Sequence, residues 1–212
     1  MATALPSAPH RRASLGTAGS VTGVVLAGGR SRRFGRDKLA EPYRGTSILQ
    51  WTVSRLAEVC DEVLVVVGPG QRPPLPSDLP IRLARDDVAD QGPLAGVAAG
   101  LPACRTTLAL VAGGDMPELS AVVLGAMLEE MADPGVPAVV LEDGDRFRPL
   151  PCALRVVPAV EAAAALLADG ERRLRALLET LHAQVLLEPR WRALDPEGRS
   201  LFDVDEPADL QG

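Results

Sequence analysis

The sequence predicts an α/β fold in which a mainly parallel sheet is covered by helices on both faces. Two observations lead to this prediction. Short apolar runs rich in β-branched residues alternate along the chain with longer segments of helical periodicity. The runs are continuously apolar rather than alternating with polar residues, which is typical of strands buried on both faces of a parallel sheet.

Seven short segments are predicted to be the strands of this sheet. The clearest is 62–67, where Glu62 is followed by apolar β-forming residues and then by Gly68 and Pro69. In chain order, the predicted strands cover residues 21–26, 62–67, 81–83, 107–112, 137–141, 150–155 and 184–187.

Helices are predicted in several of the segments between these strands, and residues 70–80 are predicted to be a proline-rich loop. The first helix begins at a cap formed by Thr46 or Ser47 and reaches Val59, with apolar residues at helical spacing. Pro93 stands in the first turn of the second. The later helices are predicted at 93–101, 119–131, 157–168, 171–181 and 207–211.

The composition argues against several classes of function. A net charge of -6 and a pI near 5.0 oppose broad nucleic-acid binding, which needs an extended basic face. No apolar run is long enough to predict a membrane span. Three widely spaced cysteines, Cys60, Cys104 and Cys152, oppose a zinc site and favour a reduced, cytoplasmic compartment.

The chain is predicted to consist of an extension and one domain. Residues 1–20 are rich in Ser, Ala, Gly and Pro and contain no apolar core of a secretory signal. We expect them to form a disordered N-terminal extension. Residues 21–212 are of a length that suits a single domain with its own core.

The one lysine of the chain, Lys38, lies in a glycine-rich stretch at 26–38, whereas 21 residues of the chain are arginine. Codon bias explains the scarcity of lysine as well as any selection does. A lysine supplies a compact charge on a flexible stem, which suits a contact with phosphate oxygens. Both explanations are compatible with the composition.

Gly28 and Gly29 follow the first predicted strand and leave room for a ligand to approach the backbone. A tight turn is the simpler interpretation, since neither a P-loop pattern nor G-x-G-x-x-G is present. Five basic residues close by favour an anion site instead. They are Arg30, Arg32, Arg33, Arg36 and Lys38.

Acidic residues follow a second predicted strand and recur near the end of the chain. Asp115 follows strand 107–112 and Gly113-Gly114, and ligands of parallel sheets bind beyond such strand ends. Asp203 and Asp205 would share one face of an extended segment. Each carboxylate could cap a following helix, or could bind Mg²⁺ beside a phosphate site.

Four segments together resemble the MobA-like nucleotidyltransferases. Residues 26–38 resemble the signature LAGGxSxRxGxDK, and 86–96 resemble an acidic stretch followed by GPLAG. Residues 114–117 are similar to the metal-binding [CG]DxP of the family, and 203–210 to its carboxyl-terminal motif, although Glu206 stands where Thr is usual. The order and spacing of all four agree over residues 21–212.

Two shorter segments are most similar to the molybdenum cofactor guanylyltransferase branch of this family. Residues 148–154 resemble its HPLxALY-like strand, with Pro151-Cys152 as a departure, and residues 169–176 resemble its GxRR helix start. The resemblance implies that Arg146, Arg148, Arg172 and Arg173 face an anionic pterin phosphate; solvated surface arginines are the equal alternative.

The resemblance implies a Rossmann-like three-layer enzyme that transfers GMP from Mg-GTP to molybdopterin cofactor and releases pyrophosphate. Such an acceptor phosphate is already anionic, so no general base is required, and catalysis can rest on positioning and charge neutralisation. Transient contact with cofactor-delivery proteins or molybdoenzymes is also implied. A cytidylyl- or sugar-phosphate nucleotidyltransferase and a non-catalytic nucleotide-binding module are the alternatives.

The resemblance also implies roles for individual residues. Lys38 and Arg33 stabilise phosphate charge, and Asp115 joins them in the catalytic set. The metal ligands for Mg²⁺ are Asp115 and Asp205. The nucleotide-binding residues are Leu26, Ala27, Gly28, Gly29, Lys38, Asp86 and Asp115.

Overall fold

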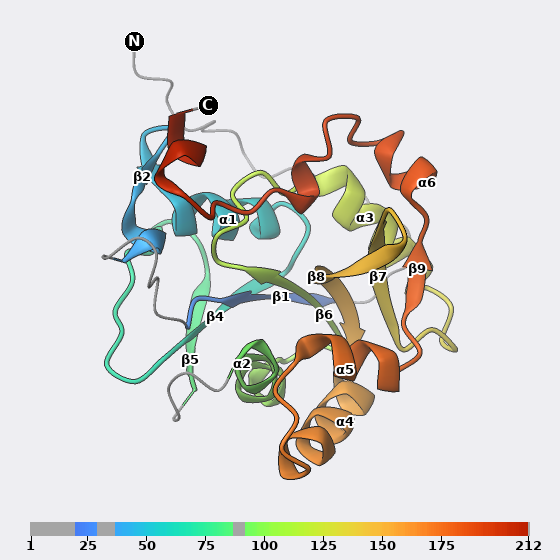
Figure 1. Ribbon diagram of the computed structural model, residues 1–212. Helices are drawn as coiled ribbons and strands as arrows, with labels where there is room; N and C mark the ends of the chain where they lie inside the picture. Colours follow the sequence, from blue (N-terminus) through green and yellow to red (C-terminus); the bar gives the residue numbers. More distant parts are fainter. Residues whose placement is uncertain (1–19, 29–36, 87–91, 212) are drawn as a thin grey trace.

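A computed structural model describes residues 20–28, 37–86 and 92–211, with helices and strands arranged as Figure 1 shows. The strands are β1 (Val21–Leu26), β2 (Pro42–Tyr43), β3 (Thr46–Ser47), β4 (Glu62–Val67), β5 (Ile81–Arg85), β6 (Leu108–Gly113), β7 (Ala138–Asp143), β8 (Arg146–Arg155) and β9 (Gln184–Leu186). The α-helices are α1 (Ile48–Ala57), α2 (Pro93–Gly100), α3 (Ala121–Glu130), α4 (Val156–Ala168), α5 (Leu174–Thr180) and α6 (Glu188–Arg192). The 3-10 helices are η1 (Lys38–Ala40), η2 (Leu101–Ala103), η3 (Arg199–Leu201) and η4 (Pro207–Gln211).

The main sheet has seven strands in the order β5-β4-β1-β6-β8-β7-β9. Strands β5, β4, β1 and β6 are parallel neighbours, and β7 and β9 are parallel to each other. Only β8, among the described strands of this sheet, runs antiparallel to both of its neighbours. The predicted α/β class, with a mainly parallel sheet, is therefore confirmed.

Helices cover both faces of this sheet and give two separate apolar cores. Helices α1, α3 and α6 lie on one side, and α2, α4 and α5 on the other (Figure 1). The first core includes Leu49 of α1, Leu124 of α3 and Trp191 of α6. The second includes Leu94 of α2, Ala159 of α4 and Leu177 of α5. These two cores fix the sheet between helical layers, as the predicted three-layer arrangement requires.

All seven predicted strands are present, and the differences lie mainly at element ends. Helix α1 begins after a capping box in which the Ser47 hydroxyl accepts from the Gln50 amide at 3.2 Å, and the Gln50 side chain accepts from the Ser47 amide at 3.1 Å. Helix α5 begins at Leu174 rather than at residue 171. The Glu171 carboxylate accepts the amides of Arg172 and Arg173, and Arg173 has an extended backbone, so the helix begins after it.

Three features differ from the prediction more clearly. Strands β2 and β3 form a hairpin whose turn places Arg44 at φ 44° and Gly45 at φ 93°, and this short element has no apolar periodicity to reveal it. Strand β8 begins at Arg146, before the predicted start, because it continues a hairpin with β7. The terminal helix was predicted at 207–211 and is the 3-10 helix η4, and α6 was not among the predicted elements.

The prediction that residues 1–20 are disordered concerns, apart from Ser20, residues outside the described part of the chain, and it stays a prediction. The assignment of 21–212 to a single domain likewise stays a prediction. None of the described helices is long and apolar enough to span a membrane.

Candidate active site

The carboxyl ends of four parallel strands meet at one edge of the sheet. Leu26, the last residue of β1, lies opposite Val66 of β4 and Gly113 of β6. Beyond the strand ends, the Ala27 amide donates to the Val66 carbonyl at 2.8 Å and the Gly114 amide to the Leu26 carbonyl at 3.0 Å. This edge therefore gathers the segments that follow β1, β4, β5 and β6, as expected for the ligand site of a parallel sheet.

Two glycines leave room for close packing where the chain leaves β6. A Cβ at Gly113 would lie 2.5 Å from Oδ1 of Asp115, so the missing side chain makes room for this carboxylate. A Cβ at Gly114 would lie 3.1 Å from Leu39 and 3.2 Å from the Leu26 carbonyl. The two glycines thus let the β6 loop pack closely against β1 and η1, and they set the position of Asp115.

The side chain of Lys38 joins three distant parts of the chain at this edge. Its Nζ atom lies 2.8 Å from Oδ2 of Asp115 and 3.7 Å from Oδ1 of Asp205. It also donates to the Val204 carbonyl. Lys38 is only 13% exposed at its side chain, whereas Asp205 is 58% exposed, so the group of charges opens to solvent on the Asp205 side.

Local structure places each of these three residues. The Asp37 carboxylate accepts from the Leu39 amide at 3.1 Å and starts the 3-10 helix that carries Lys38. The Val204 amide donates to the Asp115 carbonyl at 2.9 Å, which ties the C-terminal segment to the β6 loop. This backbone hydrogen bond holds Asp205, the residue after Val204, close to Asp115 without any contact between their side chains.

The capping alternatives for the two aspartates are not what the structure shows. Helix α3 is preceded by Ser120 at its N-cap position, not by Asp115. Near the C-terminus, it is the Asp209 carboxylate that accepts the amides of Asp205 and Glu206, each at 2.8 Å. The carboxylates of Asp115 and Asp205 face Lys38 instead.

A third carboxylate, Asp203, lies beside this group and is bound by Arg148. Nη2 of Arg148 donates to Oδ1 of Asp203 at 3.0 Å. Burial raises the pKa of Asp203, and the nearby Asp205 raises it further, while Arg148 acts in the opposite direction. The sequence placed Asp203 and Asp205 on one face of an extended segment, but nothing in it indicated Arg148 as the partner of Asp203.

The carboxylates present suit Mg²⁺. Within the described ranges, no group of three or more His, Cys, Asp and Glu side chains forms a metal site by itself. Mg²⁺ characteristically needs only one or two carboxylates, and substrate phosphates and water complete its shell. Asp115 and Asp205 present oxygens to a single cationic group, the Lys38 ammonium, so these two oxygens already surround one position of positive charge.

The remaining predicted site residues divide into two sets. Leu26, Ala27, Gly28 and Asp86 all lie at the carboxyl edge, where the Asp86 amide donates to the Val67 carbonyl at 2.9 Å. Gly29 and Arg33, with the neighbouring Arg30, Arg32 and Arg36, lie outside the described residues.

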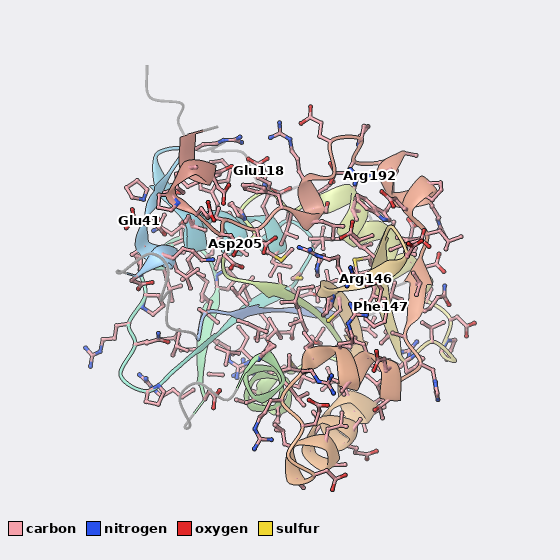
Figure 2. All side chains as sticks on the ribbon, viewed as in Figure 1. Glu41, Glu118, Arg146, Phe147, Arg192 and Asp205 are labelled. Carbon is pink, nitrogen blue, oxygen red and sulfur yellow. The ribbon has the colours of Figure 1, made fainter. Side chains whose placement is uncertain are left out.

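The arginines expected at the acceptor lie in β8 and in the loop before α5. Arg146 is exposed at the start of β8, beside Phe147 (Figure 2). Arg173 forms an ion pair with Glu171, whose pKa the hydrogen bonds from Arg173 lower to about 2. The Arg172 backbone lies against Gly92, where a Cβ would come within 2.9 Å of the Arg172 carbonyl oxygen. The loop before α5 therefore contacts the start of α2, next to the sheet edge.

The carboxyl edge of this α/β sheet brings together a lysine and two aspartates, groups that can bind the phosphates of a nucleotide and a hard cation. Residues 23–185 match the family model described as "MobA-like NTP transferase domain". The chain belongs to this family, and it is a nucleotidyltransferase.

Relatives of similar length agree with this assignment. The chain is 35% identical to a probable molybdenum cofactor guanylyltransferase of Chloroflexus aggregans over 90% of this chain and 92% of the relative. It is also 35% identical to a probable molybdenum cofactor guanylyltransferase of Mycobacterium avium, over 90% of this chain and 93% of that relative.

Solved structures support the fold. The molybdopterin-guanine dinucleotide biosynthesis protein A of Archaeoglobus fulgidus superposes with a TM-score of 0.73 at 22% identity, over 90% of this chain and 95% of that one. A 2-C-methyl-D-erythritol 4-phosphate cytidylyltransferase of Thermus thermophilus superposes with a TM-score of 0.65 at 24% identity, also over 90% of this chain and 95% of that one. Since the same fold serves more than one nucleotide and acceptor, it does not by itself select between them.

Proposed function

We propose that this protein transfers GMP from Mg-GTP to the terminal phosphate of molybdopterin cofactor and releases pyrophosphate. The observation that carries the proposal is the group formed by Lys38, Asp115 and Asp205 at the carboxyl edge of the sheet. The names of the relatives that match over nine-tenths of the chain support the choice of guanine and of the acceptor.

The proposed reaction is a substitution at the α-phosphorus of GTP. An oxygen of the acceptor phosphate forms the new bond, and the bond from the α-phosphorus to the bridging oxygen breaks, so that pyrophosphate leaves with the electron pair. The acceptor oxygen is already anionic, and no proton has to be removed from it. The protein has to hold the two phosphates in line and to balance their negative charge.

Each site residue has a proposed part in this reaction. Lys38 and Arg33 neutralise charge on the triphosphate, and the backbone from Leu26 to Gly29 approaches the nucleotide. Asp86 contacts the nucleotide at the adjoining strand end. Asp115 and Asp205 would hold Mg²⁺, which supplies charge neutralisation at the phosphates when it is bound.

The acceptor side is proposed to involve basic residues next to this edge. Arg148 lies between Asp203 and Asp143, at 3.0 and 3.8 Å, so one of its carboxylate contacts is short and the other is loose. Together with Arg146, Arg172 and Arg173, it supplies positive charge that an anionic pterin phosphate would favour. Cofactor-delivery proteins or molybdoenzymes are the proposed transient partners.

The proposed compartment is the cytoplasm. Cys60, Cys104 and Cys152 are all free thiols in the fold, and a reducing compartment maintains thiols in this state.

The proposal is tested by measuring pyrophosphate release with each of the four nucleoside triphosphates, with and without molybdenum cofactor. We expect release with GTP only, and only when both Mg²⁺ and the cofactor are present. Release with CTP in place of GTP would assign the protein to a cytidylyltransferase activity. Binding of nucleotide without release under every condition would indicate a non-catalytic module.

A further inference from the structure

A buried carboxylate, Glu118, lies at the centre of a charged cluster behind the candidate site. The Glu118 cluster consists of Tyr43, Arg44, Glu118 and Arg199. The Glu118 side chain is only 7% exposed, and Nη2 of Arg44 lies 2.7 Å from its Oε1 atom. The Tyr43 hydroxyl donates to the same oxygen, and Nη1 of Arg199 donates to Oε2. Both carboxylate oxygens are therefore satisfied by donors from other segments.

These donors come from the segments that carry the other two charged residues of the site. Tyr43 and Arg44 belong to the β2–β3 hairpin, which directly follows η1 and Lys38. Arg199 begins η3, and the chain runs from η3 through Asp203 to Asp205. Glu118 itself follows Asp115 in the loop between β6 and α3. In Figure 2, Glu118 and Asp205 both lie on the side of the sheet that α1 and α3 cover.

Further contacts join the same three segments near the Glu118 cluster. The Ser120 amide donates to the Ser200 hydroxyl at 3.2 Å, and the Val204 amide to the Asp115 carbonyl at 2.9 Å. Val204 is fully buried with Tyr43 and Ile48 in a small apolar cluster. The C-terminal segment is thus held at η3 by Glu118 and Ser120, and at Val204 by the β6 loop.

Glu118 is ionised, and its hydrogen-bond partners remain protonated donors. Burial raises its pKa, but the hydrogen bonds from Tyr43 and Arg199, with the charge of Arg44, outweigh burial and leave the pKa below its ordinary value. Burial and the Glu118 carboxylate raise the pKa of Tyr43 to about 12, so the phenol keeps its proton and donates. The net contribution of a buried ion pair to stability is often small, because the cost of desolvating the charges offsets their attraction.

We propose that Glu118 is a positioning residue, which holds the Lys38 and Asp205 segments in register with Asp115 through Tyr43, Arg44 and Arg199. Glu118 acts on the reaction only through these neighbours. The inference deepens the proposed function and rests on it wherever catalysis is concerned. Its structural part, the fixing of the C-terminal segment, does not depend on which reaction the protein performs.

The test compares Glu118→Gln with the wild-type protein by hydrogen exchange and by kinetics. Glutamine keeps the size of the side chain but removes the charge that both arginines face. We expect the Val204 amide to exchange at least tenfold faster, while amides of β1 and β6 keep their wild-type rates. We also expect about a tenfold loss of kcat and a higher Mg²⁺ concentration for half-maximal rate, since small misplacements of catalytic groups have large effects.

Glu62→Gln is the matched control. Glu62 is also a shielded carboxylate bound by an arginine, with Nη1 of Arg82 at 3.1 Å, but it lies at the opposite, amino-terminal edge of the sheet. We expect this variant to lower overall stability without changing the local opening that exposes the Val204 amide, and to leave the Mg²⁺ dependence unchanged. Tyr43→Phe removes a single donor to Glu118, and we expect it to show a smaller effect in the same direction, so it replaces Glu118→Gln if that variant does not fold.

The two parts of the inference fail in different ways. Wild-type exchange at Val204 in a folded Glu118→Gln variant, together with wild-type kinetics, would overturn the positioning role. Faster exchange at Val204 in a protein whose wild-type form transfers no nucleotide would support the structural role and overturn the proposed function instead. An equal change in Glu62→Gln would show a general loss of stability and would also overturn the inference.

Discussion

The Lys38 ammonium contacts the Asp115 carboxylate at 2.8 Å although 77 residues separate them in the sequence. The contact is possible because β1 and β6 are adjacent parallel strands whose carboxyl ends coincide, with Leu26 opposite Gly113. The only lysine of the chain therefore lies where the structure concentrates carboxylates. Its charge is balanced by Asp115 and Asp205, and a triphosphate would offer it further negative charge.

Replacement of Lys38 by alanine is expected to lower kcat about a hundredfold or more while the protein stays folded. Loss of a preorganised charge at the reacting phosphates has effects of this size. Steady-state pyrophosphate release measures kcat, and a thermal melt checks the fold. A folded variant with nearly normal kcat would rule out the role given to Lys38.

Lys38→Arg tests whether charge alone is sufficient. The guanidinium is larger and planar, and it would have to fit between Asp115, Asp205 and the Val204 carbonyl in a space that leaves the lysine side chain 13% exposed. We expect this variant to regain only a small part of the activity lost in Lys38→Ala. Full recovery would mean that the position requires positive charge but not a compact ammonium.

Replacement of Asp115 by asparagine is expected to abolish Mg²⁺-dependent pyrophosphate release. Asparagine keeps the shape of the side chain but removes the charge that a hard cation prefers. Asp78→Asn, in the exposed part of the proline-rich loop, is the matched control and should keep wild-type activity. Release by Asp115→Asn at the wild-type rate would contradict the metal assignment.

The strand pattern of this chain was predictable because it depends on local composition. Strands β1, β4 and β6 are mostly apolar and almost fully buried, which is typical of strands in a sheet covered on both faces. Gly28, Gly114 and Asp115 follow these strands at the carboxyl edge of the sheet, as predicted. The antiparallel direction of β8 was not predicted, since an apolar run carries no information about strand direction.

The partners of the site residues were less accessible to sequence reasoning. The charge balance among Lys38, Asp115 and Asp205 depends on where the C-terminal segment returns to the sheet, and Val204 sets this return by binding the β6 loop. Glu118 was passed over altogether, because a lone acidic residue before a helix has the pattern of an ordinary surface residue. Glu118 is buried because the β2–β3 hairpin brings Arg44 to its carboxylate and η3 brings Arg199, and both contacts appear only in the folded structure.

Replacement of Gly113 by alanine is expected to affect the site more than the fold. The new Cβ would lie 2.5 Å from Oδ1 of Asp115, the end of a movable side chain, so the carboxylate must shift. We expect about a tenfold loss of kcat with a higher Mg²⁺ requirement, in line with the sensitivity of catalysis to small misplacements.

Gly100→Ala gives the opposite pattern and serves as the control for Gly113→Ala. A Cβ there would lie 2.7 Å from Cγ2 of Val66 inside the apolar core under α2. Overpacking of this kind costs about 1–3 kcal/mol in stability. We expect a lower melting temperature with an unchanged Mg²⁺ requirement. Equal Mg²⁺ requirements in the two variants would contradict the claim that Gly113 acts through Asp115.

The ion pair at the opposite edge of the sheet predicts a pH dependence of stability. Burial raises the pKa of Glu62, but hydrogen bonds from Arg82 and Thr22 outweigh burial and leave the pKa below its ordinary value of 4.5. A carboxyl group whose pKa is lowered by folding stabilises the protein above its unfolded pKa, and this contribution is lost as the pH falls through the folded pKa. Glu62→Gln should therefore be less stable than the wild-type protein by about 1.5–3 kcal/mol at pH 7, the usual range for hydrogen bonds to a charged group. The difference should shrink as the pH falls below about 4.5, the usual pKa of such a carboxyl group.

Urea unfolding at several pH values measures this difference in stability. The control is Glu58→Gln, which removes the more exposed pair with Arg55 and should show little change in stability at any pH. A difference for Glu62→Gln that is the same at pH 7 and pH 3 would mean that the ionised Glu62 carboxylate does not provide this stability.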